Sequence, residues 1–261
     1  MLNPRQRELG DFLRARRSRL TPEMMGLSLQ RRRRTPGLRR EEVAELAGIG
    51  IDWYIRLEQG RPVTPSPATI EALARALKLS AMECQHLQML AGSGLRRPFK
   101  PEVAPPSLLR LLKFLKQPAY ITGRRRDLLA WNEAAESLLG FNELAKSDRN
   151  ILIAMLTYPR SRALFGKRWA AEAQRMVANF RTTHDLWAGD PAFLDLLRRL
   201  RDGCPEFQQW WERHDVGNSG SGRKILRHGK QMRTFEHTSF QFNEDPAIKL
   251  VVYTPITGKS A

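Results

Sequence analysis

The 261 residues are enough for two domains of ordinary size, and a hydrophobic content of 41% is sufficient for packed cores. Lysine and arginine outnumber aspartate and glutamate by 44 to 27, a formal net charge of +17 that favours polyanionic partners such as nucleic acid. The two cysteines, Cys84 and Cys204, form no zinc or disulfide pattern, and no apolar run approaches the roughly 18 residues of a membrane-spanning helix.

The charge excess does not locate a nucleic-acid site, because it is spread along the chain. Residues 1–100 hold 19 basic and 10 acidic residues, and residues 101–261 hold 25 and 17. The first ten residues, MLNPRQRELG, lack the apolar core of a secretory signal. We therefore expect a cytoplasmic protein with no membrane partner, and we expect no metal and no cofactor.

The first helix is expected over residues 5–17, where Leu9, Phe12 and Leu13 recur on one face. A run of four arginines, Arg31 to Arg34, follows, and Pro36-Gly37 then breaks the chain before the next helix. The run is read either as a phosphate-binding loop, because it directly precedes the next helix, or as a solvated loop.

Residues 38–61, LRREEVAELAGIGIDWYIRLEQGR, carry the most informative pattern. A short apolar-periodic helix ends at Gly48, a glycine-containing break follows, and a second helix runs from Ile51 to Glu58 and stops at Gly60. Two short helices joined by a tight glycine turn are the geometry of a helix-turn-helix. This segment predicts a duplex-DNA reader.

Two further helices complete an all-α domain. Ser66-Pro67 is an N-cap followed by proline at the first helical position, and Ile70, Leu73, Ala74 and Leu77 form the buried stripe of that fourth helix. Ser80 and Glu83 form a capping box for a fifth helix that ends at Gly92.

Residues 5–92 resemble the Xre-type helix-turn-helix domain of the phage-repressor and Cro kind, chiefly through residues 38–61 and the later IEALARALKLS. The family often has serine or threonine where this chain has Gly50, a departure that weakens the helix cap slightly. The resemblance implies that Ile51, Asp52 and Arg56 face the major groove. The alternative is a helix-turn-helix used only for protein contact.

Each of these side chains has a base or a partner that suits it. Arg56 suits guanine, and Asp52 either accepts from cytosine or orients Arg56, which lies one turn on. Ile51 or Trp53 suits a thymine methyl group, whereas Tyr54 and Leu57 have core spacing. Phosphate contacts are expected, in part from the resemblance, from Arg39, Arg40, Arg61 and the 31–34 run.

The second half begins after a linker rich in Gly, Pro and basic residues over 93–106. A helix with Leu108, Leu109, Leu112 and Leu115 precedes two short strands, AYITG and DLLAWN, with a turn at 123–126. A helical region from about 133 to 213 breaks near Pro159, residues 189–191 and residues 203–205. Three strands, RKILRHG, MRTFEHTSFQF and IKLVVYTP, end the chain; in the middle one, Thr234, Glu236, Thr238 and Phe240 alternate with the residues between them.

This order predicts an α+β protein. A five-helix Xre-type domain over 1–92 is followed by the 93–106 linker and by a PAS-like domain over 107–261. That domain is a five-stranded antiparallel sheet with a large helical insert and helices on one face. Such a sandwich encloses a cavity for a small molecule.

Six segments in order make the chain similar to the MmyB-like transcription regulators, an Xre-type reader joined to a PAS-like ligand-binding domain. They are RRTPGLRREEVAELAG, AYITGRRRDLLAWNEAA, DRNILIAML, GDPAFLDLLRRL, CPEFQQWWERHDV and LVVYTP. The resemblance implies a lipophilic ligand, and long-chain fatty acids are the ligands associated with this family.

A buried carboxylate needs a cation or several hydrogen-bond donors. The candidates for this role are Arg149, Asn150, Arg181, His214 and Asn132. Apolar walls are expected from Trp131, Phe165, Trp169, Phe207, Trp210, Trp211 and Tyr253. The competing interpretations are ordinary core for the tryptophans, an N-cap for Asn132, and a helix cap for Arg149-Asn150.

No catalytic site is expected. His184-Asp185, Cys204, His214-Asp215 and His237 form no metal spacing, and the chain has neither a GxSxG nor an HExxH motif. We expect a homodimeric transcription regulator, not an enzyme, that binds double-stranded DNA and a small lipophilic ligand. One alternative hypothesis is that the second half is a dimerisation or partner-binding module with a filled core. A second, weaker alternative is that it is an enzyme.

Overall fold

The computed structural model describes residues 3–27, 36–92, 99–217, 221–229 and 231–256. The chain divides into two compact units. The first comprises Met1–Pro98, His184–Leu194 and Glu212–Val216, and the second comprises Phe99–Thr183, Asp195–Trp211 and Gly217–Ala261. No helix in the described part of the chain is long and apolar enough to cross a membrane.

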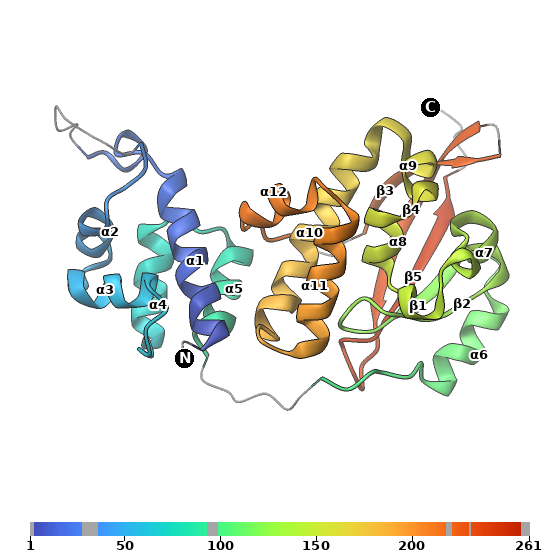
Figure 1. Cartoon of the computed structure of the whole chain (residues 1–261), viewed down its shortest axis with the longest axis horizontal. Coiled ribbons are helices and arrows are strands. Elements are labelled where there is room, and N and C mark those ends of the chain that lie inside the picture. Colours follow the sequence, from blue (N-terminus) through green and yellow to red (C-terminus); the bar gives the residue numbers. More distant parts are fainter. Residues whose placement is uncertain (1–2, 28–35, 93–98, 218–220, 230, 257–261) are drawn as a thin grey trace. The chain divides into compact units, whose positions relative to one another are not determined.

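The N-terminal part of the first unit is a five-helix bundle, as predicted (Figure 1). Its helices are α1 (Pro4–Arg19), α2 (Arg40–Ala47), α3 (Ile51–Glu58), α4 (Pro67–Ala76) and α5 (Ala81–Ala91). The expected apolar stripes meet in one core, in which Phe12, Leu13, Val43 and Leu73 are fully buried.

The helix ends follow the local signals in the sequence. Gly48, with φ of 64°, ends α2 in the left-handed conformation that favours glycine. The Ser66 hydroxyl accepts from the Thr69 amide at 3.2 Å and caps α4. Ser80 and Glu83 form the predicted capping box of α5, in which the Ser80 amide donates to the Glu83 carboxylate at 2.8 Å.

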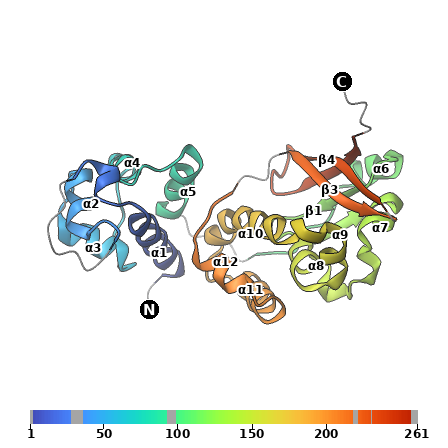
Figure 2. The same ribbon diagram turned by 90° about the horizontal axis from the view of Figure 1, so that it is seen from above.

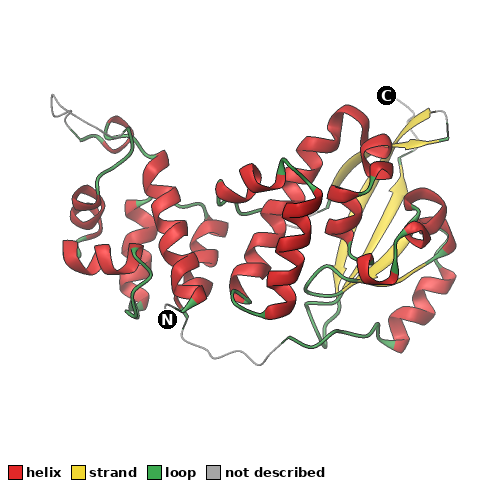
Figure 3. Ribbon diagram, viewed as in Figure 1, coloured by secondary structure: helices red, strands yellow, loops and turns green. Residues whose placement is uncertain are grey.

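The second unit is built on one antiparallel sheet in the order β2-β1-β5-β4-β3 (Figure 3). The strands are β1 (Ala119–Thr122), β2 (Leu128–Trp131), β3 (Gly222–His228), β4 (Gln231–Gln241) and β5 (Lys249–Pro255). The helices are α6 (Pro106–Phe114), α7 (Glu133–Leu139), α8 (Ile151–Thr157), α9 (Pro159–Phe165), α10 (Trp169–Leu186), α11 (Pro191–Gly203) and α12 (Phe207–Glu212). The last three helices each contribute residues to both units. The five-stranded antiparallel sheet with a helical insert is confirmed.

Strand register separates the two faces of the sheet. Tyr120 pairs with Val251, and His237 pairs with Tyr253, which places these four side chains on the face covered by α8, α9 and α10 (Figure 2). On the other face, Ile121 and Leu250 pack with α6 residues in a second core.

The prediction of helices on one face only was therefore wrong. α6 covers the opposite face, because Leu108, Leu112 and Leu115 recur at helical spacing and pack onto the apolar residues of β1 and β5. Helices therefore pack against both faces of this sheet.

Candidate DNA-reading helices and a ligand cavity

The surface of α3 presents two polar side chains. Asp52 and Arg56 are exposed and one helical turn apart, whereas Tyr54 and Leu57 are buried in the core, as their spacing predicted. Ile51 and Trp53 are half-buried and pack partly against that core. The outer surface of this helix is therefore formed mainly by Asp52 and Arg56.

A buried carboxylate fixes the C-terminal end of α3. Glu58 is 1% exposed and accepts from Arg17 Nε at 2.7 Å, from Arg17 Nη2 at 2.8 Å and from Arg40 Nε at 2.8 Å. Burial raises the pKa of this carboxyl group, but the hydrogen bonds and charges of Arg17 and Arg40 outweigh that effect and hold the pKa below its usual value. The cluster ties α1, α2 and α3 together.

The other basic residues predicted at the DNA surface have different surroundings. The half-buried Arg39 precedes α2, and its amide donates to the Glu42 carboxylate at 2.6 Å. Arg61 is exposed just beyond α3. The run from Arg31 to Arg34 lies outside the described residues. Arg40, one of the predicted phosphate contacts, belongs to the Glu58 cluster.

The second unit contains a cavity of about 510 Å³ between the inner face of the sheet and the helices that cover it. Its size is in the range of small-molecule sites. Apolar side chains from α7, α8, α9 and α10 form much of its wall. Among them are Leu139, Ile151, Leu152, Met155, Leu164, Phe165 and Met176.

The sheet side of the cavity is polar. Tyr120, Tyr253 and His237 line it from three neighbouring strands, and Arg126 lines it from the turn between β1 and β2. Burial raises the pKa of Tyr120 to about 12 and lowers the pKa of His237 to about 4, so both are neutral at pH 7. Burial also lowers the pKa of Arg126, partly offset by Tyr120.

Two positive groups lie close together at this end. Lys249 pairs with Thr122 across the sheet, and Thr122 lines the cavity. Burial, together with the charge of Arg126, lowers the pKa of Lys249 to about 8. The carboxylates that line the cavity are paired: Glu172 with Lys224 and Arg175, and Glu143 with Arg160. An anion beside Arg126 and Lys249 relieves the repulsion between them.

Of the residues predicted to bind a ligand, Tyr253 lines the cavity, as does Phe165 of the predicted walls. Asn132 does not, because its oxygen caps α7 through the Ala135 amide at 2.9 Å and its nitrogen donates to the Leu115 and Gln117 carbonyls. Asn150 likewise caps α8 through the Leu152 amide at 2.9 Å. For both asparagines, the structure gives the helix-cap alternative.

The remaining candidates also lie away from the lining. The Arg149 guanidinium lies 5.1 Å from the Trp131 ring centroid, and Arg181 is buried over Trp211 at 3.8 Å. Trp169 packs against Trp210 and donates to the Met155 carbonyl at 2.8 Å. The carbonyl of His214 accepts from Arg16, and both residues belong to the first unit. Trp169, Trp210 and Trp211 are core residues, the alternative considered for them, whereas Trp131 is half-buried.

Four further residues that were not predicted from the sequence line the cavity: Arg126, Tyr120, Lys224 and Glu172. Strand alternation contains part of the signal, because Tyr120 and Tyr253 share a face with Val251. Arg126 lies in a turn, where strand alternation gives no indication of its direction. Its φ is 70°, a rare conformation for a residue other than glycine.

A third polar cluster lies within the first unit. Glu8, His184 and Asp185 bring one ligand atom each within 4.8 Å of one another, a spacing suited to a metal ion. Asp185 also accepts hydrogen bonds from His86 Nε2 at 3.0 Å and from His184 Nδ1 at 2.9 Å when those nitrogens carry the proton. These bonds already satisfy the buried carboxylate, so the cluster needs no ion to account for it.

Two family models match the chain. Residues 104–261 match the MmyB-like transcription regulator ligand binding domain, and residues 8–87 match a helix-turn-helix domain. The first match covers more than half of the chain and contains every residue that lines the cavity. The second contains the whole of α2 and α3. Among curated proteins, no match is found.

Proposed function

The chain belongs to the MmyB-like transcription regulators, and we propose that its ligand is a fatty acid whose carboxylate binds beside Arg126. The protein is a helix-turn-helix DNA-binding regulator with a ligand-binding domain. The observation that supports this ligand is the cavity itself, which has apolar helical walls and, at its sheet side, a half-buried arginine whose pKa is lowered by burial. An acyl chain suits the first feature and a carboxylate suits the second.

The charge balance of the lining favours an acid over a neutral lipid. The two lining carboxylates have cationic partners, and the charge of Arg126 lowers the pKa of Lys249, so an anion beside these two groups is favoured. A charge-assisted hydrogen bond to a buried group is worth about 1.5–3 kcal/mol, or roughly ten- to hundredfold in affinity. The cavity is therefore expected to prefer a fatty acid to the alcohol of the same chain length.

The test compares a saturated fatty acid with its matched alcohol by calorimetry, in the wild-type protein and in Arg126→Gln. The variant is expected to lose the preference and to retain alcohol binding. Arg160→Gln is the matched control, because Arg160 also lines the cavity but forms an ion pair with Glu143. Absence of binding for both lipids in the wild-type protein refutes the ligand class. An unchanged preference in Arg126→Gln refutes the assignment of the carboxylate to that residue.

For the DNA-reading surface, we propose that Arg56 binds a base edge, with Asp52 beside it and with Ile51 and Trp53 as apolar contacts. Arg39, Arg40 and Arg61 are proposed to bind phosphate, and Glu58 holds the Arg40 guanidinium in place for that contact. Arg56→Ala should relax sequence preference at one base pair, and Arg40→Ala should weaken binding to all sequences. Equal losses on operator and random DNA in both variants refute the assignment.

We further propose that the protein acts in the cytoplasm as a homodimer on a two-fold operator. One short recognition helix discriminates few base pairs, and two copies on a palindromic site double that number. A ligand regulates the dimer only when it binds its two arrangements with different affinities. Sedimentation of the protein with operator DNA, with and without fatty acid, tests both points. One copy per operator excludes the dimer, and identical operator affinity in both conditions excludes the switch.

A further inference from the structure

Helix α6 exposes apolar side chains on a basic surface. Phe114 is 84% exposed and Leu111 is 44% exposed. The two residues are one helical turn apart, so their side chains lie side by side. Four of the ten exposed large hydrophobic side chains of the described residues fall between Val103 and Phe114, and such clustering marks an interaction surface.

These side chains are not needed for the packing of α6. Its inward stripe of Leu108, Leu112 and Leu115 already forms the core with the outer face of the sheet. Leu111 and Phe114 lie to one side of that stripe. Leu111 and Phe114 therefore do not contribute to the packing of α6, and their side chains are accessible to a partner.

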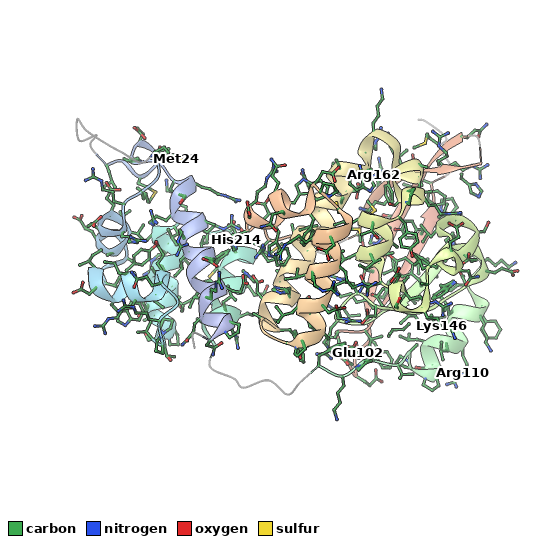
Figure 4. The ribbon with its side chains drawn as sticks, in the orientation of Figure 1. Met24, Glu102, Arg110, Lys146, Arg162 and His214 are labelled. Carbon is green, nitrogen blue, oxygen red and sulfur yellow. The ribbon has the colours of Figure 1, made fainter. Side chains whose placement is uncertain are left out.

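The charge of the same surface restricts the kind of partner. Arg110, Lys113 and Lys116 are exposed around Phe114, and residues 103–118 contain no acidic residue. Figure 4 labels Arg110 on this helix and Glu102 on the segment before it, and Glu102 is paired with Arg124. A second copy of α6 would bring like charges together. An anionic lipid surface matches both the cations and the apolar side chains.

We propose that α6 docks the protein on anionic bilayers, with Phe114 and Leu111 inserted among the lipids and Arg110, Lys113 and Lys116 at the headgroups. The sequence analysis expected no membrane partner because it found no spanning segment, and peripheral docking requires none. This inference goes beyond the proposed function and does not depend on what the cavity binds. Each basic residue near an anionic surface contributes about fivefold to partitioning, and insertion of Phe114 contributes roughly tenfold or more.

The experiment is co-sedimentation of the full chain with phosphatidylcholine vesicles, with and without phosphatidylglycerol. The net charge of +17 attracts the whole chain to anionic vesicles in a nonspecific way. The decisive measurement is therefore made above about 0.15 M ionic strength, where the Debye length is about 8 Å or less and this long-range attraction is screened. Wild-type protein should bind the anionic vesicles there, and Phe114→Ser should bind about tenfold more weakly. Met24→Ser is the control, since Met24 is also a large exposed apolar side chain but belongs to the first unit, and its loss should change nothing.

Two outcomes overturn the proposal. Equal binding by the Phe114→Ser and Met24→Ser variants, including no binding by either, shows that α6 does not insert. A wild-type dimer in solution that dissociates in Phe114→Ser shows that the surface belongs to a second copy of the chain. Both variants alter exposed side chains, so the fold should remain intact, and the thermal transition of each variant verifies this directly.

Discussion

Replacing Glu58 by glutamine should destabilise the first unit by about 3 kcal/mol. Removing one partner of a buried ion pair costs about 3–5 kcal/mol, because the other charge is left without compensation. We take the lower end because the Arg40 side chain is 40% exposed and regains water, whereas Arg17, at 14%, does not. For a domain of this size, 1 kcal/mol corresponds to about 4–8 °C. The melting temperature should therefore fall by roughly 12–24 °C.

Calorimetry of the full chain provides the assay, and any separate transition of the second unit serves as an internal reference. Glu41→Gln is the matched control, since Glu41 lies exposed on α2. The lowered pKa of Glu58 means that its contribution is present above the unfolded-state pKa of about 4.3 and is lost as the pH falls through the folded value. A loss below about 1 kcal/mol, or a loss equal to that of Glu41→Gln, refutes the reasoning that the cluster holds the three helices together.

Three further substitutions test other parts of the fold. Gly10→Ala should destabilise the first unit, because the new Cβ would lie 2.5 Å from the Glu58 carbonyl oxygen. This clash should outweigh the helix propensity of alanine, which is about 1 kcal/mol more favourable than that of glycine. A gain in stability in urea unfolding would contradict this. Asn150→Ala should cost about 1–2 kcal/mol through loss of the α8 cap, and unchanged urea unfolding would disprove the cap. His237, with its pKa lowered to about 4 by burial, should reduce stability by up to about 3 kcal/mol as the pH falls from 6.5 to 4, since the unfolded state binds the proton more readily. His237→Gln should flatten that part of the pH profile, and an identical slope in the variant would assign the effect to another group.

The helices of the first unit could be predicted because their signals are local. Ser66, Ser80 and Gly48 each act within one turn of their own position, so a helix end can be inferred without knowledge of distant residues. The strands of the second unit were predicted for a similar reason, since alternation is a property of one segment. The contribution of Glu58 could not be predicted, because it joins residues 17, 40 and 58, which no local pattern connects.

The ligand residues were harder to predict because polar residues beside apolar segments have two uses that look alike in sequence. Asn132 and Asn150 were candidates for a buried polar contact, and both are fully occupied as helix caps. A residue that directly precedes a helix satisfies amides that otherwise have no partner, and this local need takes precedence over a distant ligand. Residues that line a cavity carry no such positional mark.

The three consecutive arginines of the β1–β2 turn show why composition could not locate function in this half. Arg124 forms ion pairs with Glu102 and Asp245, and Arg125 pairs with Asp127. Arg126, with a φ of 70°, lines the cavity. Identical residue types thus serve structure in two cases and a candidate ligand site in the third. The difference lies in the groups that surround each arginine in the folded chain, which the residue type alone does not reveal.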